Sequence, residues 1–277
     1  MKRVLVLMVL LVSLVTISAC TGNEQFDLEE ETQIVVGLEA AYAPFNWSTP
    51  VSSRYTLPLE GQSGVYVDGF DVVMASQIAE ELGLELVIKA VDWDGLIPAL
   101  LAGEIDLIIA GMSPTAERAQ TVAFSNEYFR SEQVMVVSAT GAYANATSLA
   151  DFSGARVVAQ LGTLQDGLID QIPSVNHLEP LDSYGLLGTA VASNAADAFI
   201  AELPVAQGMV AANSNLKIIQ FAGTNGFTVS DEDVIVSVAL RQEDVLLLAA
   251  INAALATIST TERNQIMADA LQRQPQE

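Results

Sequence analysis

From residue 33 onward, the chain alternates short β-branched runs with longer amphipathic segments. The segment 70–82 carries apolar residues at helical spacing and is followed by Gly83, a residue typical of helix ends. The neighbouring runs are short, apolar and rich in Val, Ile and Leu, as buried strands are. This order of strand, helix, strand, helix and strand predicts a parallel sheet covered by helices. The expected strands are 33–39, 84–90 and 106–110, and the expected helices are 70–82 and 94–102.

The same alternation then repeats with different residues, after a connection rich in Gly, Ala, Asn and Ser. Two α/β units therefore follow each other along the chain, and a cleft between two such lobes is a common place for a small-molecule site. A last strand over 234–240 and a long helix over 245–259 could return to the first unit. In the second unit we expect strands at 134–137, 156–160, 177–181, 197–201 and 216–221, and helices at 164–171, 184–193 and 204–212.

The first residues have the pattern of a secretory signal peptide. A basic start is followed by an almost unbroken apolar run over 4–17, and small residues stand immediately before Cys20. The run is shorter than the ~20 apolar residues of a membrane-spanning helix, which argues against an uncleaved anchor. We predict a signal peptide over 1–19 and a polar, acid-rich tether over 20–32.

Composition excludes several classes of function. The formal net charge is −23, with 34 acidic residues against 11 Lys and Arg, so a basic patch for nucleic acid is not expected. Cys20 is the only cysteine, which rules out a disulfide within the chain. His177 is the only histidine, and no glycine-rich phosphate loop is present, so we expect neither a metal nor a cofactor.

Four stretches of the chain resemble the polar amino-acid-binding members of the bacterial solute-binding proteins. They are GLEAAYAPFNW at 37–47, GFDVVMASQIAEELGLELVIKAVDWDGLIPALLAGEIDLIIAGMSPTAERAQTVAFS at 69–125, ADFSGARVVAQLGT at 150–163 and AADAFIAELPVA at 195–206. The resemblance covers nearly all of the chain after the signal peptide, in order. It implies a type II periplasmic-binding-protein-like α/β fold, with two lobes, mixed and mainly parallel sheets, and two crossing hinge strands.

The family also implies domain boundaries, location and partners. Lobe 1 would comprise 33–130 and 234–277, and lobe 2 would comprise 131–233. The sequence Ile17-Ser18-Ala19-Cys20 resembles a lipobox, which implies a lipid on Cys20 and an extracytoplasmic protein held at a membrane surface. Such a protein captures a free amino acid by Venus-flytrap closure and delivers it to the transmembrane subunits of an ABC importer. We expect a monomer.

A receptor for an amino acid needs a partner for the ligand's carboxylate. Arg118 offers a guanidinium fork, which binds carboxylates in a bidentate manner, and it is the last residue of GMSPTAER, a loop entering a short helix. By the resemblance, Ser113 supplies a hydroxyl and a backbone N–H to the same carboxylate. Thr163, in the GT loop, supplies another N–H, and the carbonyl of Gly111 accepts from the ammonium group.

Glu202, just after the run DAFIA, is the expected partner of the ligand's ammonium group. The family usually carries an aspartate at this position. Glutamate keeps the charge and adds one methylene, so the resemblance implies the same role with a changed geometry.

Tyr42 and Trp93 match the family's aromatic residues, which enclose the ligand's side chain. Glu39 holds a position where relatives that bind cationic amino acids carry an acid, so it favours arginine, lysine or a similar ligand. Phe45 is expected to pack in the core. Asp71 is interpreted as a residue of the helix start, although it is also an acid near the floor of the cleft.

Two other classes remain open at this point. A sensor module that docks on a membrane receptor would have the same sequence features. An enzyme related to the periplasmic dehydratases would need a buried carboxylic acid as proton donor, and Glu202 with a raised pKa is the only candidate. Our prediction is a binding protein without catalytic residues.

Overall fold

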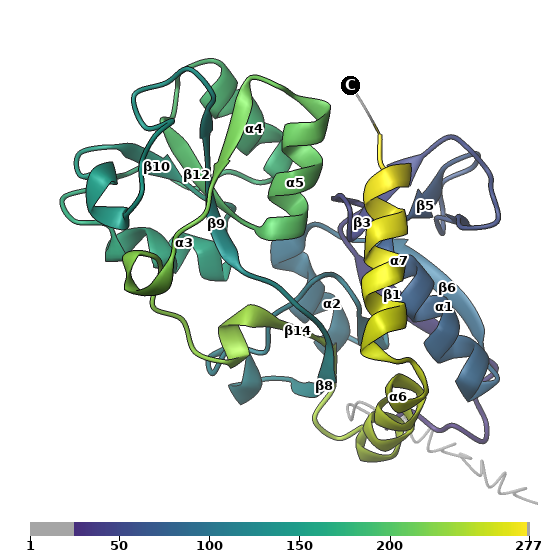
Figure 1. The fold of residues 1–277 in the computed structure, drawn as a ribbon. Helices are drawn as coiled ribbons and strands as arrows, with labels where there is room; N and C mark the ends of the chain where they lie inside the picture. The colour runs from purple at the N-terminus through teal and green to yellow at the C-terminus, as the bar shows by residue number, and fades with distance from the viewer. Residues whose placement is uncertain (1–24, 276–277) are drawn as a thin grey trace, which may run out of the picture.

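The computed structural model describes residues 25–275, which form two α/β lobes side by side (Figure 1). The signal peptide expected over 1–19 and the lipid site expected at Cys20 lie outside these residues. Within 25–275, no single helix is long and apolar enough to cross a membrane, and the one pair of helices that reaches this length is bent by 84°.

The first lobe is built on a five-stranded sheet, whose members are β1 (Gln33–Leu38), β6 (Glu85–Ala90), β7 (Leu107–Ile108), β8 (Ala123–Arg130) and β14 (Ile235–Leu240). Their order in the sheet is β6-β1-β7-β14-β8. The strands β6, β1 and β7 are parallel, whereas β14 is antiparallel to both β7 and β8. The end of the chain therefore returns to the first lobe.

The second lobe repeats this plan with β9 (Gln133–Ser138), β10 (Arg156–Val158), β11 (Asn176–His177), β12 (Ala198–Glu202) and β13 (Leu216–Ile219). The order is β11-β10-β12-β9-β13, with β9 antiparallel to its two neighbours. All five residues of β12 are buried, as expected for a central strand covered on both faces. The predicted fold class, with two mixed sheets flanked by helices, is confirmed.

Helices cover both sheets. Those of the first lobe are α1 (Phe70–Leu82), α2 (Leu96–Leu101), α6 (Val245–Thr257) and α7 (Thr260–Arg273), with single turns η1 (Trp93–Gly95) and η2 (Arg118–Gln120). Those of the second lobe are α3 (Leu164–Leu168), α4 (Tyr184–Ala192) and α5 (Leu203–Ala212). Short turns η3 (Leu149–Phe152), η4 (Ile169–Gln171), η5 (Gly223–Asn225) and η6 (Glu232–Val234) complete the set. Gly83 ends α1 in the left-handed conformation, as its position predicts.

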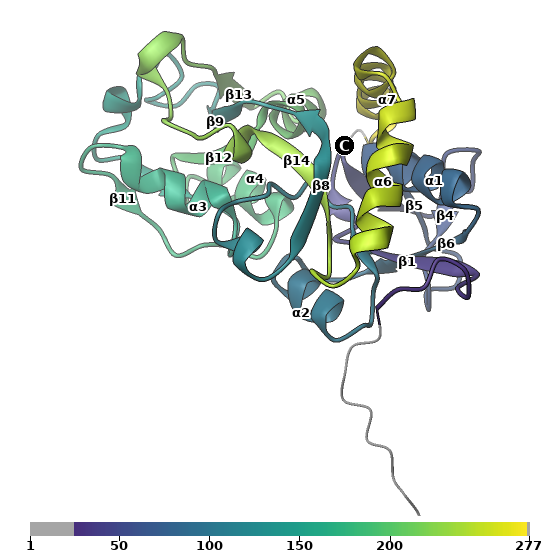
Figure 2. The same ribbon diagram turned by 90° about the horizontal axis from the view of Figure 1, so that it is seen from below.

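Two segments cross between the lobes, one from β8 to β9 and one from β13 to β14 (Figure 2). They are bonded to each other, because the N–H of Ser131 donates to the carbonyl of Val234 at 2.8 Å. On the second-lobe side, the N–H of Leu203 donates to the carbonyl of Glu132 at 2.9 Å. The lobes are thus joined by a short, hydrogen-bonded hinge.

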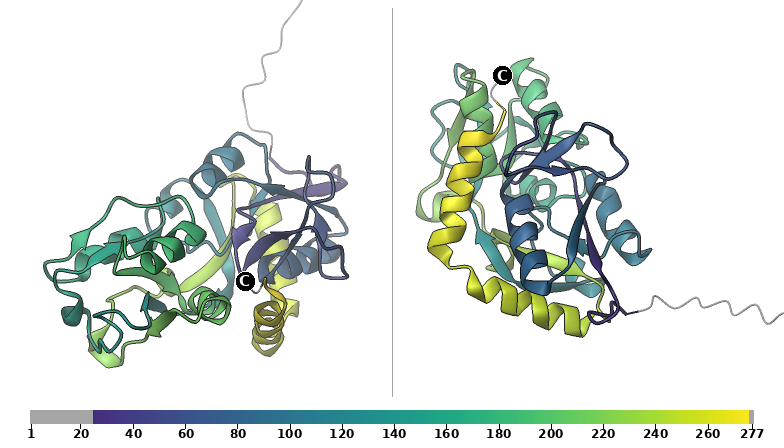
Figure 3. Two further views of the ribbon diagram at one scale, coloured as in Figure 1. Left: turned by 90° about the horizontal axis from the view of Figure 1, so that it is seen from above. Right: turned by 90° about the vertical axis from the view of Figure 1, so that its right-hand side faces the viewer.

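Three elements of the fold were not predicted from the sequence. One is a small antiparallel sheet, to which the segment 48–68 contributes, formed by β2 (Ala41–Tyr42), β3 (Asn46–Thr49), β4 (Leu57–Pro58) and β5 (Tyr66–Asp68). The long helix expected over 245–259 ends at Thr257, and the separate helix α7 was not foreseen (Figure 3). Strand β8 was missed as well. Arg273, at the end of α7, forms a 2.9 Å ion pair with Asp68 and so ties the last helix to the small sheet.

Candidate ligand-binding site

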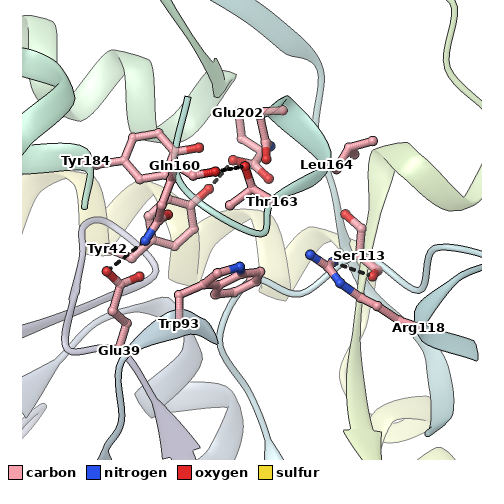
Figure 4. A pocket seen from close by; sticks show the side chains of 12 residues that line it. Glu39, Tyr42, Trp93, Ser113, Arg118, Gln160, Thr163, Leu164, Tyr184 and Glu202 are labelled. Carbon is pink, nitrogen blue, oxygen red and sulfur yellow. Dashed lines mark hydrogen bonds between the residues drawn. The ribbon is translucent and has the colours of Figure 1, made fainter. Parts of the chain in front are cut away.

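A narrow cavity lies between the two lobes (Figure 4). The structure brings all eight expected site residues to its wall: Glu39, Tyr42, Trp93, Gly111, Ser113, Arg118, Thr163 and Glu202. Four further lining residues were not foreseen: Gln160, Leu164, Gln165 and Tyr184.

The wall is assembled where strands end. Glu39 directly follows β1, Gly111 follows β7, Gln160 follows β10, and Glu202 is the last residue of β12. The carboxyl ends of parallel strands in α/β sheets are the usual place for ligands. Because both lobes turn these ends toward each other, residues from four strands meet in one cavity.

Arg118 holds the end of the cavity where the carboxylate was expected. Its guanidinium donates to the carbonyl of Ser113 at 2.9 Å and, across the cleft, to the carbonyl of Gly162 at 3.2 Å. The indole N–H of Trp93 donates to the same Gly162 carbonyl at 3.1 Å, and the guanidinium lies 5.1 Å from the Trp93 ring centre. Burial lowers the pKa of Arg118, while Glu202 acts in the opposite direction.

Glu202 is buried, with 5 % of its surface exposed. The hydroxyl of Tyr42 donates to its carboxylate, so this contact also joins the two lobes. Burial raises the pKa of Glu202, and the hydrogen bond from Tyr42 and the charge of Arg118 oppose that rise. The Tyr42 ring stacks on Phe45, which is fully buried as expected, at 5.3 Å.

Glu39 lies at the other end of the cavity. Its carboxylate accepts a hydrogen bond from the side-chain amide of Gln160 at 3.0 Å, a further contact between the lobes. Burial raises its pKa to about 7, and the charge of Asp92 adds to the rise. A carboxylate in this state is favoured in its ionised form when a cation comes close.

The position of Gly111 requires glycine on two counts. Its φ of +65° is in the left-handed region, where only glycine is unstrained. A Cβ atom here would also lie 2.9 Å from the Tyr42 ring. On the opposite wall, the hydroxyl and the N–H of Thr163 both reach the carbonyl of Gln160, at 2.7 and 3.3 Å.

The sequence indicates the unforeseen lining residues to different extents. Gln160 lies inside the family-like run 150–163, which ends in LGT. The run therefore indicated that Gln160 is near the site, but not that its side chain lines the cavity. Gln165 is buried and donates to the side chain of Gln133 at 3.0 Å. Tyr184, the first residue of α4, places its ring 4.8 Å from Tyr42, and nothing in the spacing of the sequence indicates this contact.

Within residues 25–275, no group of three or more His, Cys, Asp or Glu side chains is arranged to hold a metal ion. The polar groups of the cavity are instead one guanidinium, two carboxylates, amides and hydroxyls. Such a set suits a small zwitterion that carries additional positive charge.

Residues 34–271 match the family of bacterial extracellular solute-binding proteins, family 3. The chain belongs to this family, which places it outside the cytoplasm. It is 28% identical over 251 residues to an arginine-binding extracellular protein of Bacillus subtilis, covering 89% of each chain. A probable histidine-binding protein of Campylobacter jejuni is 29% identical over 195 residues, which is 70% of each chain.

Solved structures of related proteins give the same assignment. An amino acid ABC transporter substrate-binding protein of Streptococcus pneumoniae bound to L-arginine has a TM-score of 0.72 at 26% identity, covering 88% of this chain and 97% of that one. A mutant of the arginine-binding protein of T. maritima has a TM-score of 0.69 at 30% identity, covering 88% and 96%. The family consists of solute-binding proteins and not of enzymes.

Proposed function

We propose that the chain binds a free cationic L-amino acid, arginine above all, between its lobes and delivers it to an ABC importer. The observation that carries the proposal is the charge of the cavity wall. It holds one guanidinium, Arg118, and two carboxylates, the half-buried Glu39 and the buried Glu202, whose pKa values are both raised by burial. A ligand with one anionic and two cationic groups matches this wall group for group.

The ligand would lie along the cavity from Arg118 to Glu39. Its carboxylate would accept two parallel hydrogen bonds from the Arg118 guanidinium. These would replace the single hydrogen bonds that Arg118 now donates to the carbonyls of Ser113 and Gly162. Its α-ammonium would pair with Glu202 and with the carbonyl of Gly111. Its side chain would extend past Tyr42 toward Glu39, whose ionised form a guanidinium stabilises.

The arginine-binding relative supports this class of ligand by its name. The probable histidine-binding protein, and an octopine-binding periplasmic protein of Rhizobium meliloti that is 30% identical over 170 residues (59% of this chain and 49% of that one), show that the ligands named for the relatives are not restricted to arginine. A glutamine-binding protein of Bacillus subtilis is 28% identical over 240 residues, so a neutral polar ligand is the main competitor. The acid at Glu39 favours the cationic ligand.

In this proposal the two lobes, 33–130 with 234–277 and 131–233, move as units about the hinge. A ligand that contacts both walls binds the closed form better and so shifts the population toward it. The closed, loaded monomer would then be what the importer's transmembrane subunits recognise. A lipid on Cys20 would hold the protein at the membrane surface beside them.

Thermal-shift screening against the twenty amino acids and ornithine tests the proposal, because a ligand that binds only the native state raises its apparent stability. Arginine should give the largest shift, followed by lysine and ornithine, and calorimetry should give one site per chain. A larger shift with glutamate or with an aliphatic amino acid would overturn the assignment of the ligand class. No shift with any of them would overturn amino-acid binding itself.

A further inference from the structure

A further carboxylate, Asp71, lies behind the wall of the cavity and does not line it. It belongs to the first turn of α1 and is completely buried. No side chain caps this helix, so the carboxylate of Asp71 does not serve as the cap that its position suggests. Its oxygens accept instead from the side-chain amide of Asn46 and from the hydroxyl of Tyr128, both at 2.8 Å.

Each of these two partners leads to a backbone group of the cavity wall. The Tyr128 oxygen accepts from the N–H of Gly111 at 3.1 Å. The Asn46 side-chain carbonyl accepts from the N–H of Ala40 at 2.8 Å, and Ala40 stands between the first-lobe site residues Glu39 and Tyr42. Asp71 is therefore the common acceptor behind the backbone at Gly111 and the backbone at Ala40.

The link to Gly111 matters because glycine has no side chain to restrict its backbone. The bond from the Gly111 N–H to Tyr128 holds the peptide plane before Gly111, and the Tyr42 ring lies against Gly111, so both restrict the backbone rotations that set the direction of the Gly111 carbonyl. Ala40 has a φ of +56°, an uncommon conformation for a residue with a side chain, which its hydrogen bond to Asn46 maintains. Both segments would have other conformations available without these bonds.

The ionised form of Asp71 is the one that fits the network. A carboxylate accepts from Asn46 and Tyr128 together, and the Tyr128 oxygen then remains an acceptor for Gly111. Burial raises the pKa of Asp71 to about 7, and the charge of Glu202 adds to the rise. Holding such a charge without a cation among its hydrogen-bond partners is costly, whereas packing alone would be served by an apolar residue.

We propose that Asp71 is a positioning residue for the ligand's α-ammonium group, acting through Tyr128 on the Gly111 carbonyl and through Asn46 on the segment 39–42. The proposal rests on the proposed function, because it assumes that an amino acid occupies the cavity. It adds that recognition of the ammonium depends on a residue that the ligand does not touch.

Calorimetry with two ligands separates positioning from general support of the fold. Arginine carries the α-ammonium, and δ-guanidinovalerate is the same molecule without it. Tyr128→Phe keeps the ring, which stacks on Phe70 at 5.8 Å, and removes only the relay. We expect arginine affinity to fall about tenfold and δ-guanidinovalerate affinity to change less than twofold.

Asp71→Asn should reproduce this selective loss, and the double variant should be no weaker than the Asp71→Asn single variant, because both changes interrupt one chain of bonds. Tyr143→Phe is the matched control, since Tyr143 lies in the second lobe against Phe152 and should bind both ligands like the parent. If Asp71→Asn does not fold, Tyr128→Phe alone carries the test.

Equal losses for both ligands, or unchanged arginine affinity in Tyr128→Phe, would overturn the role of Asp71. Failure of the proposed function is visible separately, in the parent protein. If the parent binds glutamine and not arginine, the cationic ligand class is wrong. The same comparison with glutamine and glutaramate, its analogue without the α-ammonium, then tests Asp71.

Discussion

The two walls of the cavity differ in what lies behind them. The first-lobe wall is held by its own hydrogen bonds, which run from Gly111 and Ala40 to the buried Asp71. On the second-lobe wall, Gln160 and Glu202 have partners in their own lobe, the carbonyl of Asp182 and the side chain of Gln165, and each takes one more from the first lobe: Gln160 donates to Glu39, and Glu202 accepts from Tyr42. The buried charge behind the first-lobe wall indicates that this lobe is preorganised for recognition, whereas part of the contacts of the second lobe depends on closure.

Mutations in the two walls should have different effects on binding. Changes in the first wall should remove recognition in any conformation, while changes in the second wall should weaken the closed form and leave weak binding to the open form. Calorimetry measures the first effect, and the ligand-dependent decrease in radius of gyration by small-angle scattering measures the second.

Arg118→Ala should have the largest effect. The ligand's carboxylate would lose its charge-assisted partner in a desolvated cleft, which costs about 2–5 kcal/mol. Affinity should fall by about 30- to 5,000-fold in calorimetry, with the melting temperature of the free protein nearly unchanged. Arg118→Lys, which keeps the charge and loses the fork, should recover part of the affinity. Near-native affinity in Arg118→Ala would remove this residue from the site.

Glu202→Gln comes next and tests the second wall. Its removal leaves the ligand's ammonium without a charged partner, and the range of about 2–5 kcal/mol for one partner of a buried pair applies again. Scattering should show a smaller decrease in size on adding arginine. Glu202→Asp restores the commoner family residue with a shorter reach, and we expect a moderate loss. Unchanged affinity in Glu202→Gln would contradict the pairing, and loss of a measurable turnover with unchanged affinity would favour an enzyme.

Much of the fold could be predicted because its buried strands are short apolar runs and several of its helices repeat apolar residues at helical spacing. The fully apolar run before Glu202 and the amphipathic run 70–82 are examples. Strand β8 was missed because half of its sequence, AFSNEYFR, is polar, and helix α7 because its sequence, TTERNQIMADALQR, is mostly polar. The small sheet was missed because its strands are only two to four residues long, too short for a period to appear.

The candidate site was predictable only where the family-like runs carry it. Tyr184 belongs to the cavity because the lobes meet, and nothing in its local sequence indicates that meeting. Asp71 was interpreted as a helix-start residue, and its position in the first turn is as expected. Its partners Asn46 and Tyr128 are 25 and 57 residues away, so its function as a common acceptor follows from tertiary structure alone.

Glu39→Gln distinguishes the ligand's charge. A hydrogen bond to a charged partner contributes about 2 kcal/mol, so arginine should bind about 30-fold more weakly, and glutamine should be nearly unaffected. Competition calorimetry with both ligands measures the ratio. Equal losses for the two, or preferred binding of glutamate by the parent, would show that Glu39 does not select the ligand.

The pH dependence of binding should be somewhat smaller. The pKa of Glu39 is raised to about 7, so the free protein is protonated there below pH 7, and binding a guanidinium must first remove that proton. Affinity for arginine should therefore fall about tenfold from pH 8 to pH 6, with proton release seen in buffers of different ionisation enthalpy. Glu39→Gln should flatten the profile apart from what Asp71 and Glu202, whose pKa values burial also raises, contribute. An affinity that rises toward pH 6 would contradict this sign.

Trp93→Phe should have the smallest effect, and it tests the contrast between the walls most directly. The indole N–H of Trp93, on the first lobe, donates to the carbonyl of Gly162 on the second at 3.1 Å. Phenylalanine keeps an aromatic face near Arg118 and removes this bond, which is worth about 1 kcal/mol. If the bond acts only in the closed form, affinity should fall about fivefold, and scattering should show a less complete closure at saturating arginine.

The other tryptophan, Trp47, is buried in β3 away from the cavity lining, and Trp47→Phe should lower stability and leave closure unchanged. A loss of affinity with full closure would instead place the contribution of Trp93 in the first wall alone, and the two walls would not differ in the way described.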